Sequence, residues 1–108
     1  MSNESIIFEI LEWKSKSGVA DNQMIDAVEA MVDDLKGLEG FLNQTLYKDD
    51  SGVWVDIYYW KTEQDAHNSN ASMANKESFK QLIELIEPDS VSIKVMPALQ
   101  HSGHFSFQ

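Results

Sequence analysis

The chain has 108 residues, of which 43% are hydrophobic and 24% charged, and this length suits a single domain. Its 18 acidic and 8 basic residues give a net charge of −10, which disfavours nucleic acid and anionic membranes as partners. The lack of cysteine excludes disulfides and thiolate metal sites, and it fits a reducing cytoplasm, where we expect the protein to reside.

The first two expected elements are a strand and a helix. Residues 6–14 predict the strand, on which we expect Glu9 and Glu12 to face solvent or an interface. Residues 21–36 predict the clearest helix of the chain, because apolar side chains recur on one stripe at helical spacing. The stripe consists of Met24, Ile25, Val28, Met31, Val32 and Leu35.

The next two strands form a predicted hairpin, and a capped helix follows them. Residues 41–48 and 53–61 are rich in β-branched and aromatic side chains and are joined by a short turn that contains glycine. Thr62 to Asp65 resembles a capping box, with Asp in place of Glu or Gln, and predicts the start of a helix. The polar run at 68–70 could break that helix.

The last expected elements are a helix and a strand. Phe79, Leu82, Ile83 and Ile86 share one helical face, and Pro88 ends that helix. Residues 90–96 predict the final strand. The order β-α-β-β-α-β indicates a ferredoxin-like α+β fold, with a four-stranded antiparallel sheet and the helices on one face. We expect one domain over residues 1–108, with a core at about 6–96 and a C-terminal tail at 97–108.

The third strand carries large side chains in both of its alternating rows. We expect Val55, Ile57 and Tyr59 to face the helices. The other row would then line the uncovered face of the sheet; it consists of Trp54, Asp56, Tyr58 and Trp60. Three large aromatic rings are too apolar to leave in water, so a second copy of the sheet is the natural cover. The sequence therefore predicts a homodimer through the sheet face.

Two segments resemble a known family. One is the Gly37-Leu38-Glu39-Gly40-Phe41 turn between the first helix and the second strand, and the other runs from Val55 through Trp60 to Ala66, a strand that ends in Trp and leads into a capped helix. They are similar to segments of the dimeric α/β-barrel superfamily, and within it of the antibiotic biosynthesis monooxygenase-like proteins. The resemblance implies a dimeric α/β barrel. Some members oxidise phenolic or polycyclic substrates with molecular oxygen and no cofactor, some degrade haem, and others only bind small molecules, so the fold alone does not decide the function.

The sequence departs from this family at two places. Many members have an acidic residue two positions before the strand-end Trp, where this chain has Tyr58. Many have a His in the following helix, but His67 lies closer to Trp60 than that pattern implies. Residues 71–86 contain no His that could serve as the axial haem ligand of the haem-degrading branch, which argues against haem degradation.

Candidate catalytic residues are an acid and a histidine. Cofactor-free oxygenation requires removal of a proton and shielding of the resulting anion from water. Asp56 is the acid most suited to act as base or to orient a hydroxyl, and His67 is the second catalytic candidate. Each has a structural alternative: Asp56 could only accept a hydrogen bond from a Trp or Tyr or pair with Lys94, and His67 could be an ordinary surface residue.

Candidate substrate-binding residues are aromatic side chains and one amide. Trp54, Tyr58 and Trp60 could form the walls of a cavity, although packing alone also explains such rings. Asn43 and Gln44 have opposite orientations on the neighbouring strand, so at most one points inward, and we select Asn43. Metal and nucleotide motifs are absent from the sequence, and His101 and His104 in the tail are weak evidence for a metal site.

The sequence leaves three functions open. The first is a cofactor-independent monooxygenase that acts on a small aromatic or phenolic metabolite in a cavity of the barrel. The second is a non-catalytic module that binds a small molecule in the same cavity. The third is a structural dimerisation domain whose interior is filled by its own side chains.

Overall fold

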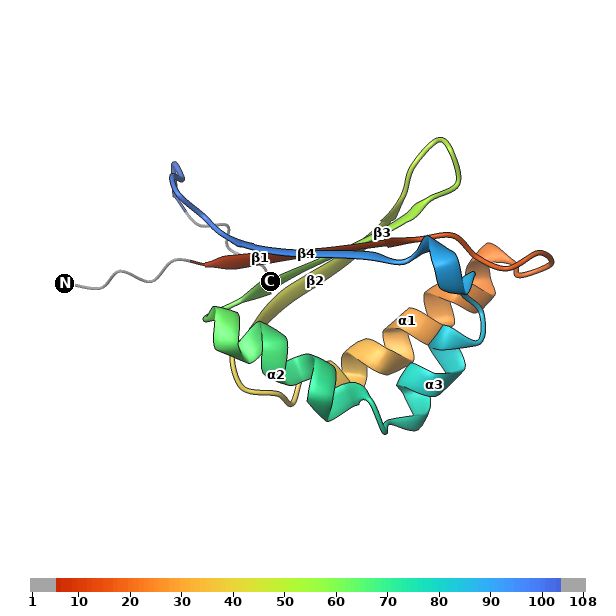
Figure 1. Ribbon diagram of the computed structural model, residues 1–108, viewed down its shortest axis with the longest axis horizontal. Helices are drawn as coiled ribbons and strands as arrows, with labels where there is room; N and C mark the ends of the chain where they lie inside the picture. Colours follow the sequence, from red (N-terminus) through yellow and green to blue (C-terminus); the bar gives the residue numbers. More distant parts are fainter. Residues whose placement is uncertain (1–5, 104–108) are drawn as a thin grey trace.

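The structure is a computed structural model that describes residues 6–103. The elements in chain order are β1 (Ile7–Trp13), α1 (Asp21–Leu35), β2 (Phe41–Lys48), β3 (Trp54–Trp60), α2 (Glu63–Met73), α3 (Glu77–Ile83), the 3-10 turn η1 (Pro88–Ser90) and β4 (Ser92–Pro97). The strands form one antiparallel sheet in the order β2-β3-β1-β4. All three α-helices lie on the same side of this sheet (Figure 1). The predicted ferredoxin-like α+β fold is therefore confirmed.

The α-helices follow from local sequence with two departures. α1 buries its predicted stripe except for Ile25, which is exposed. Thr62 caps α2 as predicted, because its hydroxyl accepts a hydrogen bond from the Asp65 backbone N–H at 3.0 Å. The predicted break at 68–70 is wrong, since α2 continues to Met73. Ser69 is buried there, and its hydroxyl donates to the Ala66 carbonyl at 2.6 Å, so this polar side chain is satisfied within the helix.

The two faces of β3 are the reverse of the prediction. Trp54, Asp56, Tyr58 and Trp60 are all buried on the face that the helices cover. The other row, Val55, Ile57 and Tyr59, is only partly buried and lies on the open face. Alternation identifies the two rows of a strand but not their directions, and here both rows are largely apolar. The larger side chains occupy the deeper space between the sheet and the helices.

The reversal also places Glu9 in the interior. Glu9 is paired across the sheet with Tyr58, so it shares the covered face, and only 3% of it is exposed. The expectation that Glu9 faces solvent or an interface is therefore wrong. Glu12 is exposed, as expected. A buried carboxyl on a central strand is costly unless it is hydrogen-bonded, which makes the surroundings of Glu9 informative.

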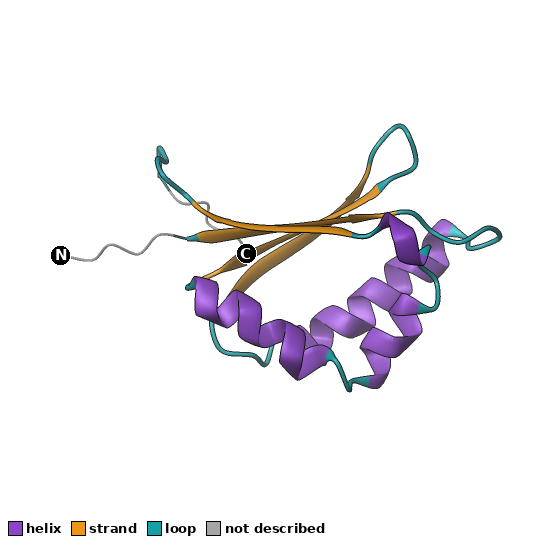
Figure 2. Ribbon diagram, viewed as in Figure 1, coloured by secondary structure: helices purple, strands orange, loops and turns teal. Residues whose placement is uncertain are grey.

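The opposite face of the sheet has no helix over it in the described part of the chain (Figure 2). Phe8 and Ile10 of β1 lie beside Tyr59 and Ile57 of β3 on this open face, and the Phe8 and Tyr59 rings meet edge to face at 5.8 Å. The face is thus apolar at its centre. No helix within residues 6–103 is long and apolar enough to cross a membrane.

Candidate functional site

A hydrogen-bonded carboxyl lies at the centre of the covered face. Asp56 is fully buried, and its Oδ2 accepts a hydrogen bond of 2.6 Å from the Tyr58 hydroxyl. Its Oδ1 accepts a second hydrogen bond of 2.6 Å from Gln44 Nε2 on the neighbouring strand. β3 places Asp56 and Tyr58 on one face because they are two residues apart, and the β2–β3 register brings Gln44 beside them.

A second buried carboxyl lies on the adjacent strand. The Trp60 indole Nε1 donates to Glu9 Oε1 at 2.8 Å, and Trp60 is itself fully buried. The Tyr58 and Trp60 rings stack with a centroid separation of 6.4 Å and an interplanar angle of 19°. The site therefore contains two carboxyl groups, each held by an aromatic donor of β3.

Burial raises the pKa values of the acidic groups in this cluster. Desolvation raises the pKa of Asp56 from 3.8 to about 6, although the hydrogen bonds from Tyr58 and Gln44 oppose the shift. Desolvation also raises the pKa of Glu9 above 4.5, with the Trp60 hydrogen bond opposing it and the charge of Asp56 adding to it. The pKa of Tyr58 is raised well above 10.0 by desolvation and by the neighbouring carboxylates, so Tyr58 stays a hydrogen-bond donor. Asp56 is thus a base whose pKa lies near neutrality, which suits proton transfer.

A small inner cavity lies beside these groups, between the sheet and the helices. It encloses about 50 Å³ and is bordered by Glu9, Tyr58 and Trp60 on the sheet side. The helices contribute apolar and small polar side chains, namely Met31, Leu35, Ser69, Asn70, Met73 and Phe79. This volume holds one or two water molecules and is too small for an aromatic ring.

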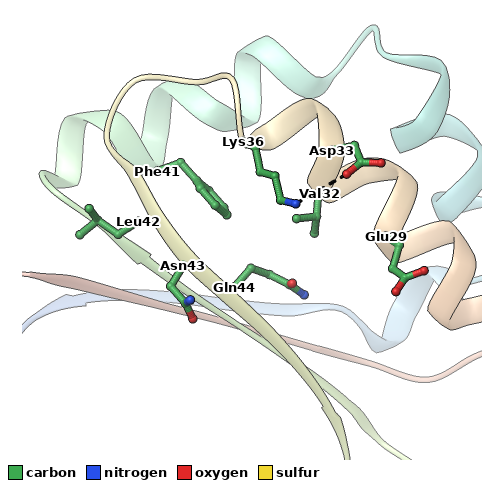
Figure 3. A pocket seen from close by; sticks show the side chains of 8 residues that line it. All are labelled: Glu29, Val32, Asp33, Lys36, Phe41, Leu42, Asn43 and Gln44. Carbon is green, nitrogen blue, oxygen red and sulfur yellow. Dashed lines mark ion pairs between the residues drawn. The ribbon is translucent and has the colours of Figure 1, made fainter. Parts of the chain in front are cut away.

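A larger groove runs along the edge of the sheet between α1 and β2 (Figure 3). It encloses about 650 Å³, which lies within the range of small-molecule sites. Phe41 and Gln44 of β2 line it on the helix side of the strand, and Val32 adds an apolar wall from α1. Charged side chains stand at its rim, and they are Glu29 and Asp33 of α1 and Lys36, the residue that follows α1.

The structure brings three of the six predicted site residues together. Asp56, Tyr58 and Trp60 lie in one connected cluster. Trp54 shares their face but lies at the other end of β3, where its ring is 5.1 Å from Lys48 Nζ and its indole N–H is buried without a partner among the described residues.

The other two predicted residues lie outside the cluster. Asn43 borders the groove, but its register places its side chain on the open face, where its Oδ1 accepts a 3.4 Å hydrogen bond from Thr45. His67 is exposed on α2, with its Nε2 3.3 Å from Glu63 Oε2. His104 lies outside the described residues.

Two residues of the cluster were not selected from sequence. From the sequence we select Asn43 in place of Gln44. A β-bulge between Phe41 and Asn43 interrupts the alternation of side chains along β2, so the strand pattern alone does not show which of the two faces the helices. Glu9 was expected outside the interior, although a Glu within an apolar strand is a recognisable signal for a buried partner.

Comparison with known proteins gives a fold but no close relative. No family model matches the sequence, and no curated protein matches it. The cofactor-independent oxygenase SnoaB from Streptomyces nogalater is similar in structure, with a TM-score of 0.76, 13% identity, and coverage of 93% of this chain and 99% of that one. Rv0793 from Mycobacterium tuberculosis has a TM-score of 0.72 and 17% identity over 92% of this chain and 100% of that one.

A third similar structure has the same arrangement. It is a protein from Bordetella bronchiseptica assigned provisionally to the antibiotic biosynthesis monooxygenases, with a TM-score of 0.75, 13% identity, and coverage of 89% of this chain and 99% of that one. Identities this low carry the fold and not the activity. The chain therefore has the ferredoxin-like α+β fold that antibiotic biosynthesis monooxygenases share, over nearly its whole described length.

Proposed function

We propose that the protein is a cofactor-independent monooxygenase that acts on a small aromatic or phenolic metabolite. The observation that carries this proposal is the fully buried Asp56, which Tyr58 and Gln44 hold by hydrogen bonds and whose pKa is raised to about 6. At neutral pH this carboxyl is mostly ionised, yet it is a stronger base than an ordinary aspartate. The shared fold with a cofactor-independent oxygenase supports the same reaction class.

The chemistry that these groups suit begins with loss of a proton from the substrate. Asp56 accepts the proton, directly or through the Tyr58 hydroxyl, and leaves an electron-rich carbanion or phenolate. That anion adds molecular oxygen. For a ring CH2 group, one oxygen atom becomes a carbonyl oxygen and the other leaves as water with the two hydrogens, so no external reductant is consumed. The rings of Phe41, Tyr58 and Trp60 limit the access of bulk water to the buried Asp56.

A second candidate function is a non-catalytic binding or structural domain of the same fold. The observation in its favour is the nearly filled interior, with about 50 Å³ beside Glu9, Tyr58 and Trp60. Asp56 then serves only as the acceptor that orders Gln44 and Tyr58.

The protein is also proposed to act as a homodimer through its sheet face. The support is the apolar open face, where the half-buried side chains of Phe8, Ile10, Ile57 and Tyr59 have no helix over them among residues 6–103. A second copy of the same face would bury them isologously. This interface differs from the expectation in one respect, because the aromatic row of Trp54 to Trp60 faces the helices and not the partner.

Oxygen uptake by the purified protein tests the enzymatic proposal. A panel of anthrones and hydroquinones is supplied without flavin or metal, and the products are identified by mass spectrometry with labelled oxygen. We expect saturable uptake, a kcat/KM that rises with pH through about 6, and a loss of roughly 100-fold or more in Asp56→Asn. Glu84→Gln is the matched control, because Glu84 is an exposed acid at the end of α3 that lines neither the groove nor the inner cavity.

Each alternative result has a definite meaning. Uptake that is unchanged in Asp56→Asn would remove Asp56 from the mechanism. Saturable binding of the same compounds without uptake would support the binding module, and the absence of both binding and uptake would support the structural domain.

A further inference from the structure

The two spaces lined by the hydrogen-bond partners of Asp56, Gln44 and Tyr58, differ greatly in size. The inner cavity encloses about 50 Å³, whereas the groove between α1 and β2 encloses about 650 Å³. An aromatic metabolite needs a site of at least about 300 Å³. A ligand of the proposed class therefore fits the groove and does not fit the inner cavity.

Two residues that line the groove also contact the buried cluster. Phe41 lines the groove, and its ring meets Trp60 edge to face at 5.6 Å and Tyr58 at 6.5 Å. Gln44 also lines the groove, and its Nε2 is 2.6 Å from Asp56 Oδ1. Phe41 and Gln44 therefore connect the groove to the cluster that contains Asp56.

We propose that the groove between α1 and β2 is the substrate-binding site, and that Gln44 is a positioning residue. Its Nε2 moves away from Asp56 Oδ1 when the ligand binds, and a hydroxyl group of the ligand donates to that oxygen instead. This inference rests on the proposed function for its ligand class, and it adds where the ligand binds and how it reaches the base. A phenolic O–H replaces the amide N–H as donor, so Asp56 stays satisfied during the exchange. Gln44 is suited to this movement because its side chain is unbranched and lies on an edge strand that faces the groove.

The charges at the rim define the ligand class further. Glu29 and Asp33 are exposed carboxylates, and Lys36 is the one cation that lines the groove, with its Nζ 3.8 Å from Asp33 Oδ1. The rim therefore carries a net charge of −1, from two carboxylates and one ammonium group. It favours neutral phenols and aromatics that bear an amine, and it disfavours aromatics that bear a carboxylate.

The first test asks whether a ligand hydroxyl reaches Asp56. The carboxyl pKa of Asp56 is followed by carbon-13 NMR in Gln44→Met, which keeps the length of the side chain and removes the donor. We expect the pKa of Asp56 to rise in this variant, and 2-naphthol to bring it back toward the wild-type value by supplying the lost hydrogen bond. The control ligand 2-methoxynaphthalene has no donor and should leave the pKa raised. Gln44→Met keeps Tyr58 and Glu9, the other titratable groups that surround Asp56, so these groups are the same in the titrations with either ligand.

The second test asks whether the groove selects by charge. Backbone amide shifts locate the binding of 2-naphthol, 2-naphthylmethylamine and 2-naphthoate in the wild-type protein. We expect shifts at Val32, Lys36 and Leu42, and an affinity for the amine about three- to tenfold above that for the carboxylate. Asp33→Lys should reverse this preference. Glu84→Lys makes the same charge change just after α3, outside the groove, and should leave the preference intact.

Two results would overturn the inference. One is an equal effect of 2-naphthol and 2-methoxynaphthalene on Asp56 in Gln44→Met. The other is a shift pattern confined to the open face or to α3. Neither test requires turnover, so a protein that passes both but takes up no oxygen would refute the oxygenase and leave the groove as a binding site. Oxygen uptake by a protein whose groove binds none of the probes would refute the groove alone.

Discussion

At the scale of single residues, the proposed chemistry depends on how two carboxyl groups are buried. Asp56 is bound by Gln44 and Tyr58, and Glu9 by Trp60. These hydrogen bonds favour the ionised carboxylates, but desolvation exceeds them and both pKa values are raised. The folded protein therefore holds these protons at a pH where an unfolded chain has released them, which couples stability to pH.

The pH dependence of unfolding should reveal the buried Asp56. The pKa of an ordinary aspartate is 3.8, and that of Asp56 in the folded protein is about 6. The contribution of Asp56 to the free energy of unfolding should therefore be greatest below pH 4 and fall as the pH rises to about 6. The shift corresponds to a fall of about 3 kcal/mol, at 1.36 kcal/mol for each pH unit. Urea unfolding of wild type and Asp56→Asn at several pH values checks this. The difference between the two proteins reports Asp56 together with its charge effect on Glu9, because Glu9 itself is present in both. A difference that is constant with pH would refute the raised pKa.

The hydrogen bond from Trp60 to Glu9 should be visible in a matched pair of variants. Trp60→Phe removes the donor at 2.8 Å, and we expect a loss of about 3 kcal/mol at pH 7 and a smaller loss at pH 4, where Glu9 is protonated. Trp54→Phe makes the same change on the same strand face, but its indole N–H has no partner among the described residues. Its cost should therefore be independent of pH. Equal pH profiles for the two variants would show that the Trp60 hydrogen bond does not stabilise the carboxylate.

At the scale of the elements, the turn between α1 and β2 is tied to the start of α2. Gly40 has a φ of +83°, and its carbonyl accepts a 2.9 Å hydrogen bond from the Lys61 backbone N–H. The Asp65 carboxyl, in the first turn of α2, occupies the space that a Cβ at Gly40 would need. The glycine thus allows α2 to begin against the strand that carries Phe41 and Gln44.

Substitution of this glycine should be costly for two reasons. Gly40→Ala places a Cβ in a left-handed backbone and against the Asp65 side chain, so we expect a loss of about 2–4 kcal/mol. Gly52→Ala is the matched control, because Gly52 has a φ of +88° with nothing within 4 Å of the added atom, and it should cost only about 1 kcal/mol. Urea unfolding of both variants measures the difference. Similar losses would mean that Asp65 moves aside without penalty.

At the scale of the whole molecule, the sheet has one face covered by helices and one face open. The covered face contains the carboxyl cluster and its aromatic rings, and the open face is apolar along β1 and β3. The carboxyl cluster, which is the proposed reaction site, and the proposed dimer contact are therefore on opposite sides of the same four strands. A change at the dimer contact should leave the carboxyl cluster folded.

The oligomeric state tests the role of the open face. We expect the wild-type protein to sediment as a dimer and Ile57→Glu to sediment as a monomer, because a buried unpaired charge at the centre of the contact is unfavourable. Ile83→Glu is the control, since Ile83 is 44% exposed on α3, away from the sheet. Sedimentation equilibrium gives the mass, and far-UV circular dichroism verifies the fold. A monomeric wild-type protein, or a dimer unaffected by Ile57→Glu, would exclude this interface.

The elements of the fold were accessible from sequence because their signals are local. β2 begins at Phe41 and ends at Lys48, and Thr62 caps α2, both as predicted. Strand alternation, helical spacing and a cap depend on residues a few positions apart, so one sequence contains them. A hydrogen bond from a Tyr to Asp56 was also accessible from sequence, since an acid within an aromatic strand must find partners wherever that strand is buried.

The direction of the rows and the composition of the site were decided by tertiary structure. Both rows of β3 are apolar enough to be buried, so only the fit of Trp54, Tyr58 and Trp60 into the space under the helices selects the covered face. Gln44 and Glu9 join the cluster through cross-strand register, which depends on residues 12 and 47 positions from Asp56 and on a bulge in β2. The local pattern determines which side chains share a row, whereas packing against distant elements determines what that row contacts.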